Sequence, residues 1–262
     1  MKYRPFGKLD FQVSALGFGA MRLPIINRDT TKINESEAIK MIHYAFDHGV
    51  NYIDTAWFYH GGFSEVVVGK SLKDGYRDKI QLATKLPVRL IQKIDDCDKY
   101  LDKQFKRLET DYIDFYLLHG LNGRTWPMIR DLDIFPWAEK AIKDGKFRYL
   151  GFSFHDEFDV FKDIIDTYEK WTFCQIQYNF MDTEYQAGTK GLKYAAERGL
   201  AVVIMEPIRG GALAKNPPES VVQLWDSAPI KRSPAEWALH TRILVRYNPK
   251  SYTSQARTRT SS

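Results

Sequence analysis

Short apolar runs alternate with segments of helical periodicity between about residue 50 and residue 207. The runs are rich in β-branched and aromatic residues, and their first residues lie 24–37 positions apart, about the length of one βα unit. This rhythm predicts a parallel sheet whose strands are buried on both faces. The predicted strands are Asn51–Ala56, Ile80–Leu86, Tyr112–His119, Tyr149–Phe154, Phe173–Asn179 and Ala201–Pro207.

Amphipathic segments between the runs predict crossover helices. Glu35–His48 and Asp95–Leu108 each place their apolar residues on one helical face. Ser233–Leu239 begins with a serine N-cap and a proline at the first helical position, so it predicts a further helix after the last predicted strand. Glycines stand just before three predicted strands, where a helix C-terminus favours a residue able to adopt positive φ: Gly49, Gly145 and Gly199.

The start of the chain adds two more elements to this pattern. Lys2–Phe11, with its Gly7-Lys8 turn, predicts a small β-hairpin, and Val13–Ala20 predicts a seventh strand ahead of the first helix. Seven evenly spaced strands without a linker favour an α/β fold of the closed (β/α)8 TIM barrel type over an open doubly wound sheet. The last βα unit is missing from the count, since Ile243–Val245 is either the end of a helix or a weak eighth strand.

Charge separates the body of the chain from its end. The formal net charge is 38 − 33 = +5, and residues 240–262 hold five basic residues and no acidic one, so residues 1–239 are neutral overall. A neutral body gives little electrostatic attraction for nucleic acid or membrane surfaces. We therefore expect a barrel domain over residues 1–239, followed by a basic, divergent tail over residues 240–262.

Cysteine usage and hydropathy predict a cytoplasmic protein. Cys97 and Cys174 are too far apart to suggest a metal motif or a disulfide framework. The N-terminal residues lack the apolar stretch of a signal peptide, and the longest apolar run is far shorter than the roughly 20 residues that cross a bilayer.

Three consecutive predicted strands end in an ionisable residue. These are Asp54, Lys85 and His119, and Tyr59 follows Asp54 by five positions. Each residue alone is compatible with a structural role, such as a helix cap, a solvated strand end or a core histidine. Because the active site of a (β/α)8 barrel lies at the C-terminal ends of its strands, their convergence on one rim favours acid–base chemistry.

The types of these four residues favour one reaction. A phenol has an ordinary pKa of about 10, and a neighbouring lysine ammonium lowers that pKa, which makes Tyr59 a better general acid. Asp54 would hold Lys85 charged and in place, while His119 would orient a carbonyl oxygen. Such a group suits protonation of an oxyanion as hydride reaches the adjacent carbon, and hydride requires a cofactor.

Several segments resemble the aldo-keto reductase superfamily: NYIDTAWFYHGGFSEVVVGKSL, ATKLP, DYIDFYLLH, GKFRYLGFSFH and CQIQYN. The resemblance covers residues 1–239, and the family's Asp-Tyr-Lys-His tetrad matches Asp54, Tyr59, Lys85 and His119. It implies a (β/α)8 barrel that uses NADPH, less often NADH, without metal, to reduce aldehydes or ketones to alcohols. GFSFH and Met205-Glu206-Pro207 resemble a bacterial and archaeal branch whose longer members carry a cysteine-rich iron–sulfur tail, which this sequence lacks.

The resemblance also implies cofactor and substrate contacts. Ser153 and Gln175 match the family's carboxamide-binding residues, and Met205 replaces its nicotinamide-stacking tyrosine. The loop Glu206–Leu213 matches the pyrophosphate loop and contributes Glu206, Ile208 and Gly210. Trp57, Phe58 and Phe154 predict an aromatic-walled substrate pocket, with Phe154 standing where the family usually has asparagine.

The family's segment for the adenosine 2′-phosphate has no counterpart after Leu239. We interpret residues 240–262 as a truncated or frame-altered end, with capture of the 2′-phosphate by Arg242 and Arg246 as the less favoured alternative. An incomplete barrel exposes strand edges, which favours self-association.

The leading hypothesis is an NADPH-dependent reductase of a small-molecule carbonyl substrate. Two alternatives remain: a non-catalytic cofactor-sensing or interaction protein on the same barrel, and nucleic-acid binding through the tail, which we do not expect.

Overall fold

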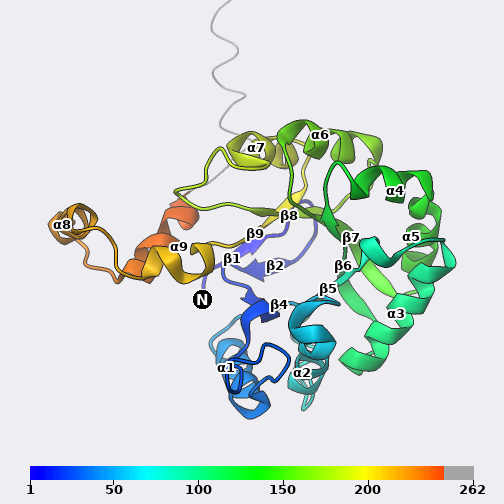
Figure 1. The fold of residues 1–262 in the computed structure, drawn as a ribbon, viewed down its shortest axis with the longest axis horizontal. Helices are drawn as coiled ribbons and strands as arrows, with labels where there is room; N and C mark the ends of the chain where they lie inside the picture. The colour runs from blue at the N-terminus through cyan, green and yellow to red at the C-terminus, as the bar shows by residue number, and fades with distance from the viewer. Residues whose placement is uncertain (245–262) are drawn as a thin grey trace, which may run out of the picture.

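Seven parallel strands form one curled sheet in the computed structural model, which describes the backbone of residues 1–244 and the side chains of residues 1–239. Each strand pairs with its neighbours in the sequence. The helices lie around the outside of the sheet (Figure 1). The strands are β3 (Phe18–Gly19), β4 (Tyr52–Asp54), β5 (Gln81–Leu86), β6 (Ile113–Leu121), β7 (Phe147–Phe154), β8 (Phe173–Gln177) and β9 (Ala201–Met205).

Every crossover between these strands contains at least one helix. Both amphipathic helices expected from the sequence are confirmed, as α1 (Glu35–Asp47) and α3 (Asp95–Leu108), and Gly49, Gly145 and Gly199 do take positive φ. The remaining helices are α2 (Phe63–Ser71), α4 (Thr125–Asp131), α5 (Ile134–Lys143), α6 (Phe158–Thr167), α7 (Gly188–Glu197), α8 (Glu219–Ser227) and α9 (Pro234–Leu244), with short 3-10 segments at Ala20–Arg22, Tyr59–Gly62, Val88–Leu90 and Arg209–Ala214.

The six strands predicted after residue 50 are all present, but the prediction of one strand over Val13–Ala20 is wrong. That run divides between two sheets: β2 (Gln12–Ser14) pairs antiparallel with β1 (Tyr3–Pro5), whereas β3 pairs with β4. The chain turns between β2 and β3, where the Ser14 hydroxyl donates to the Leu16 carbonyl at 2.7 Å. The predicted N-terminal hairpin is confirmed, but its second strand is β2, which lies beyond the predicted range Lys2–Phe11.

Aromatic side chains fill the end of the barrel that the hairpin covers. The Phe6 ring follows β1 and lies 4.8 Å from the ring of Phe115 on β6, 5.6 Å from Phe173 on β8 and 6.2 Å from Tyr52 on β4, measured between centroids. All four side chains are buried. They form an interior cluster separate from the larger core between the sheet and the helices, so the hairpin closes one end of the barrel.

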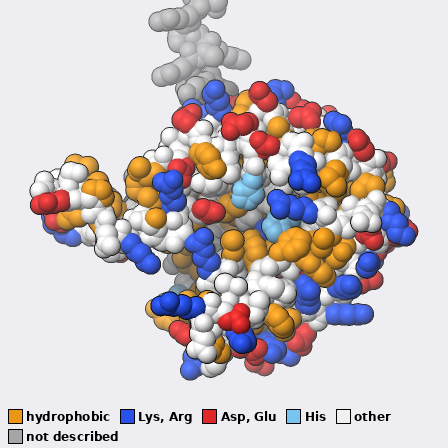
Figure 2. Space-filling model, in the orientation of Figure 1, with side chains coloured by type: hydrophobic (Ala, Val, Ile, Leu, Met, Phe, Trp, Pro, Cys, Tyr) orange, Lys and Arg blue, Asp and Glu red, His pale blue; other side chains and the backbone are white. Residues whose placement is uncertain are grey.

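The last described strand leaves the sheet open. Among residues 1–244, no strand joins the edges formed by β3 and β9. Helix α8 has no buried residue and stands out from the body (Figures 1 and 2). Helix α9 begins as the sequence predicts, with the Glu236 N–H donating to Ser233 Oγ at 3.3 Å. It continues through residues 240–244, so Ile243 and Leu244 are helical, while Val245 lies outside the described residues.

No helix in the described part of the chain is long and apolar enough to cross a membrane.

The position of Phe6 predicts a large contribution to stability. Its replacement removes the aromatic contacts that close the barrel, so we expect Phe6→Ala to lower the free energy of unfolding by about 3–5 kcal/mol. Urea unfolding measures the change. As a matched control, Tyr44→Ala on the surface, where Tyr44 is 67% exposed, should change it by less than about 0.5 kcal/mol. Equal effects of the two substitutions would contradict the closing role of Phe6.

Candidate active site

Inward-facing side chains change from apolar to polar along the strands. On β4, Tyr52 is followed two residues later by Asp54, and on β8, Phe173 is followed by Gln175. Because successive side chains of a strand alternate between its faces, both members of each pair point into the barrel. The register places Ser153 of β7 beside Gln175. Polar groups therefore gather at the C-terminal rim, at the opposite end of the barrel from the hairpin.

Three of the four predicted catalytic residues meet at one ammonium group. Lys85 Nζ donates to Asp54 Oδ1 at 2.6 Å, to the Thr55 carbonyl at 2.9 Å and to the Tyr59 hydroxyl at 3.3 Å. The lysine side chain is 1% exposed, and Asp54 is also buried. The structure thus brings together the residues that the sequence placed on separate strand ends.

Burial and charge act in opposite directions on this pair. Burial lowers the pKa of Lys85, but the charge of Asp54, the Tyr59 hydroxyl and their hydrogen bonds outweigh it, so the pKa lies above its ordinary value. Burial raises the pKa of Tyr59, and Lys85 lowers it only in part, so the net direction is upward. The expectation of a net lowering of the Tyr59 pKa is therefore wrong, because sequence alone could not weigh burial against the lysine.

A β-bulge places His119 on the same rim. The ladder between β6 and β7 shifts between Leu118 and Leu121, and Gly120 adopts φ 66°, which favours glycine. The Gly120 N–H donates to Ser153 Oγ at 2.8 Å, which replaces a ladder hydrogen bond. The His119 ring lies 6.0 Å from the Tyr59 ring, edge to face.

His119 is held neutral. Burial first, and then the charges of Lys85, His155 and Arg89, lower its pKa to about 3. Its Nδ1 atom is buried and has no hydrogen-bond partner among the described residues. A neutral imidazole facing the rim can donate one hydrogen bond to a bound group or accept one from it. Its N–H can therefore orient a carbonyl oxygen.

The predicted carboxamide contacts lie beside this cluster. Ser153 and Gln175 are buried neighbours on β7 and β8, and Gln175 Nε2 donates to Asp54 Oδ2 at 3.3 Å. Because Ser153 Oγ accepts from Gly120, its hydroxyl hydrogen can still donate outward. A serine donor beside a glutamine oxygen fits a primary carboxamide.

The predicted pyrophosphate loop follows β9 and faces a cation that sequence reasoning missed. Met205 ends β9 and is half-buried, as is Ile208, while Glu206 and Gly210 are exposed. A Cβ atom on Gly210 would clash with Nη1 of Arg22, which lies after β3. Within the described chain this guanidinium has no ion-pair partner. The sequence held one signal for this cation, since Arg22 is a basic residue just after the end of the predicted strand Val13–Ala20.

The aromatic residues divide into different roles. Phe58 is 46% exposed, with its ring 6.1 Å from the His119 ring, so it lies at the mouth of the site. Trp57 is half-buried and packs edge-on against Tyr100 of α3. Phe154 is fully buried, and its ring packs on Phe161 of α6. Placing Phe154 in the substrate pocket is therefore wrong, because its position on β7 turns it toward the outer helices.

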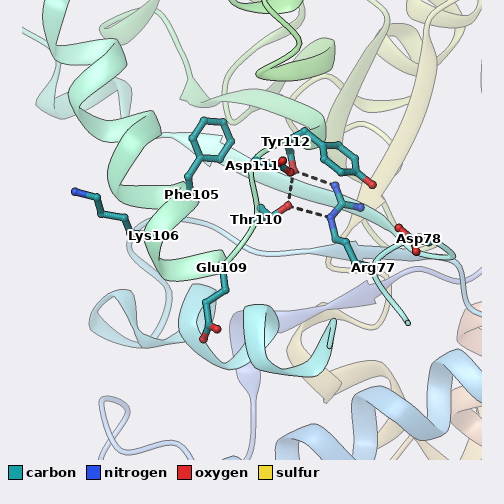
Figure 3. A pocket seen from close by; sticks show the side chains of 8 residues that line it. All are labelled: Arg77, Asp78, Phe105, Lys106, Glu109, Thr110, Asp111 and Tyr112. Atoms are coloured by element: carbon teal, nitrogen blue, oxygen red, sulfur yellow. Dashed lines mark hydrogen bonds between the residues drawn. The ribbon is translucent and has the colours of Figure 1, made fainter. Parts of the chain in front are cut away.

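Two pockets differ in their relation to the rim. The larger, about 670 Å³, lies near the start of β6 at the opposite end of the strands, around Arg77 and Tyr112 (Figure 3). The smaller, about 270 Å³, lies between the segment after β3 and the segment after β4, and is lined by Met21, Arg22, Leu23, Ile25, Thr30, Phe58, His60 and Gly61. Figure 2 shows histidine side chains near the middle of the visible face, with basic side chains beside them. The smaller pocket shares Phe58 with the mouth of the site, but neither pocket is lined by Asp54, Tyr59, Lys85 or His119.

No group of three or more His, Cys, Asp or Glu side chains in the described residues is arranged to hold a metal ion.

Comparisons with family models, curated proteins and solved structures all match the same family. The model of the Aldo/keto reductase family matches residues 15–239. A probable aldo-keto reductase 1 from Glycine max is 34% identical over 155 residues, which cover 56% of this chain and 43% of that protein. The uncharacterized oxidoreductase YrpG from Bacillus subtilis (strain 168) is 29% identical over 81% of this chain and 68% of its own length. The holo form of aldo-keto reductase AKR11C1 from Bacillus halodurans has a TM-score of 0.74 and 30% identity, over 91% of this chain and 81% of that one.

The neutral state of His119 predicts a pH dependence of stability. In the unfolded chain His119 binds a proton below about pH 6.5, whereas in the folded protein it stays neutral down to about pH 3. The unfolded state then holds more protons, so the free energy of unfolding falls as pH is lowered from 6.5, by up to about 1.4 kcal/mol per pH unit. We expect His119→Gln to lose this part of the dependence in urea unfolding at pH 7 and pH 5. A stability difference between wild type and variant that is the same at both pH values would contradict the assignment.

Proposed function

Since the chain belongs to the aldo/keto reductase family, we propose that it is an NADP(H)-dependent oxidoreductase that reduces an aldehyde or ketone to an alcohol. The observation that supports this best is the group of Asp54, Lys85 and Tyr59, in which the lysine ammonium contacts the carboxylate at 2.6 Å and the phenol at 3.3 Å. This arrangement suits delivery of one proton to an oxygen that becomes negative during the reaction.

The reduced nicotinamide supplies the hydride when it is bound. Tyr59 then donates its hydroxyl proton to the substrate oxygen as that oxygen gains negative charge. Lys85 stabilises the resulting phenolate, and Asp54 keeps the lysine charged and directed at the phenol. His119 orients the carbonyl oxygen through one hydrogen bond. A proton from solvent afterwards restores the tyrosine.

The residues of this chain also suit the nicotinamide end and the central pyrophosphate of the cofactor. Ser153 and Gln175 would hold the carboxamide beside the rim, with Met205 as an apolar platform for the nicotinamide. Arg22 and the backbone N–H groups around Gly210 would meet the pyrophosphate, because a guanidinium and a glycine-rich loop both favour phosphate oxygens. Glu206 and Ile208 would shape the same loop. Arg242 and Arg246, weighed above for the 2′-phosphate, fall beyond the described side chains.

The pocket that Phe58 borders suggests the kind of substrate. Its lining combines the apolar Met21, Leu23, Ile25 and Phe58 with the polar Arg22, Thr30 and His60, within a volume of about 270 Å³. Such a volume suits a small carbonyl compound with an apolar substituent. Trp57 would support Phe58 from behind rather than form the pocket wall.

Tyr59→Phe tests the general acid. We expect the rate of NADPH-dependent carbonyl reduction to fall by about 100-fold or more, because no proton donor remains, while the dissociation constant for NADPH changes by less than about twofold. Stopped-flow turnover and fluorescence titration measure the two quantities.

The matched control is Tyr52→Phe, whose hydroxyl lies in the same barrel without a hydrogen-bond partner among the described residues. It should leave turnover nearly unchanged. Undiminished turnover of Tyr59→Phe would overturn the assignment, and cofactor binding by a wild type without turnover would favour the non-catalytic alternative.

Arg22→Met tests the cofactor loop. We expect it to weaken NADPH and NADH binding by a similar factor, about tenfold, because both dinucleotides share the pyrophosphate. Tryptophan fluorescence of the full chain follows each titration, with the exposed Arg28→Met in the same segment as a control. Unchanged binding of both cofactors would remove Arg22 from the proposed site.

A further inference from the structure

The segment that carries Tyr59 has little regular structure of its own. Between the end of β4 and the start of α2, His60, Gly61 and Gly62 all take positive φ, at 53°, 65° and 97°. Few local backbone bonds stabilise it; the Tyr59 N–H donates to the Ala56 carbonyl at 3.1 Å. The position of the Tyr59 hydroxyl must therefore depend on contacts from outside the segment.

Arg107, near the end of α3, contacts this segment on both sides of Tyr59. Its guanidinium lies 3.7 Å from the centre of the Trp57 ring, and Nη1 donates to the Trp57 carbonyl at 3.3 Å. On the other side, a Cβ atom on Gly62 would come within 2.9 Å of Arg107 Nη2. The flat guanidinium thus fills the space between the two ends of the segment.

Glu65 links this arginine to the strand that carries Lys85. Its carboxylate is fully buried and accepts from Arg107 Nη1 at 3.0 Å, from Thr84 Oγ1 at 2.7 Å and from Gln104 Nε2 at 2.6 Å. Gln104 Nε2 also donates to the Lys85 carbonyl at 3.1 Å. One buried carboxylate therefore connects both segments whose side chains meet at the ammonium group.

We propose that Arg107 and Glu65 are positioning residues that hold the Tyr59 hydroxyl at the Lys85 ammonium. The inference rests on the proposed function, because it assigns these residues to the placement of the general acid. Neither residue contacts the reacting atoms. Their effect is exerted through the backbone of Trp57 and Gly62 on one side and of Lys85 on the other.

The opposite end of the barrel provides a matched control. Arg77 lies 3.8 Å from the centre of the Tyr112 ring and donates to the Tyr112 carbonyl at 2.9 Å (Figure 3). It also donates to the buried Asp114 at 2.8 Å. It shares three kinds of contact with Arg107, namely an aromatic face, the backbone carbonyl of that aromatic residue and a buried carboxylate, and it also donates to the Thr110 hydroxyl and the Ile80 carbonyl. It lies far from the Lys85 rim along the strands, so it shares the structural role without the positioning role.

The experiment compares Arg107→Met with Arg77→Met in the full chain. We expect both to lower the thermal unfolding midpoint, but only Arg107→Met to lower kcat, by about 10- to 100-fold, because a small displacement of the acid slows proton transfer. KM for substrate and the dissociation constant for NADPH should change by less than about twofold. Arg107→Lys keeps the charge beside Glu65 and the fold, but cannot form the planar contact with Trp57, so we expect it to lose kcat without losing stability.

Hydrogen exchange supplies a readout that needs no turnover. Arg107→Met should accelerate exchange of the amides of Thr55, Tyr59 and Gly61, and Arg77→Met should not. If wild type reduces no carbonyl compound, the proposed function fails and this comparison still decides the inference. Three outcomes would each overturn the inference. Both Arg107 variants could retain kcat, or Arg107→Met and Arg77→Met could lose kcat equally. Exchange over residues 55–62 could also stay unchanged in Arg107→Met.

Discussion

A lysine ammonium enclosed in the barrel constrains the rest of the site. Lys85 is 1% exposed, and a buried charge is strongly destabilising unless opposite charge and hydrogen-bond acceptors surround it. Asp54, the Thr55 carbonyl and the Tyr59 hydroxyl provide those partners. All three come from β4 and the segment after it, so the pairing of β4 with β5, which sets Asp54 beside Ala83, is needed to accommodate the lysine.

The two ends of the barrel solve different physical problems. At the hairpin end, Phe6 packs on the aromatic side chains of β4, β6 and β8 and closes the interior. At the other rim, the same strands present polar groups that need partners, and they find them in one another. Arginines on the outer elements stabilise both ends in a similar way, Arg77 with Asp114 and Arg107 with Glu65. Both clusters stabilise the fold, but only the Arg107–Glu65 cluster contacts the segment that carries Tyr59.

Much of the fold and of the catalytic group could be predicted from the sequence. Strand spacing identified the parallel sheet because each βα unit has nearly constant length. Asp54, Lys85 and His119 could be placed on one rim because parallel strands end on the same side. The prediction failed for Val13–Ala20, because a β-forming pattern does not indicate whether the residues join one sheet or divide between two. It also failed for Phe154, because Phe154 and Ser153 are adjacent on β7 and their side chains point to opposite faces of the sheet.

The sequence by itself determined the order of the elements and the kinds of chemical group at the strand ends, because periodicity and residue type are local properties of the chain. Only the tertiary structure decided the direction of the Tyr59 pKa, the neutral state of His119 and the connection of Arg107 and Glu65 to the Tyr59 segment. These depend on burial and on distances between segments far apart in the sequence, 50 residues in the case of Arg107 and Trp57. Burial and distance arise only when the sheet curls and the helices pack against it.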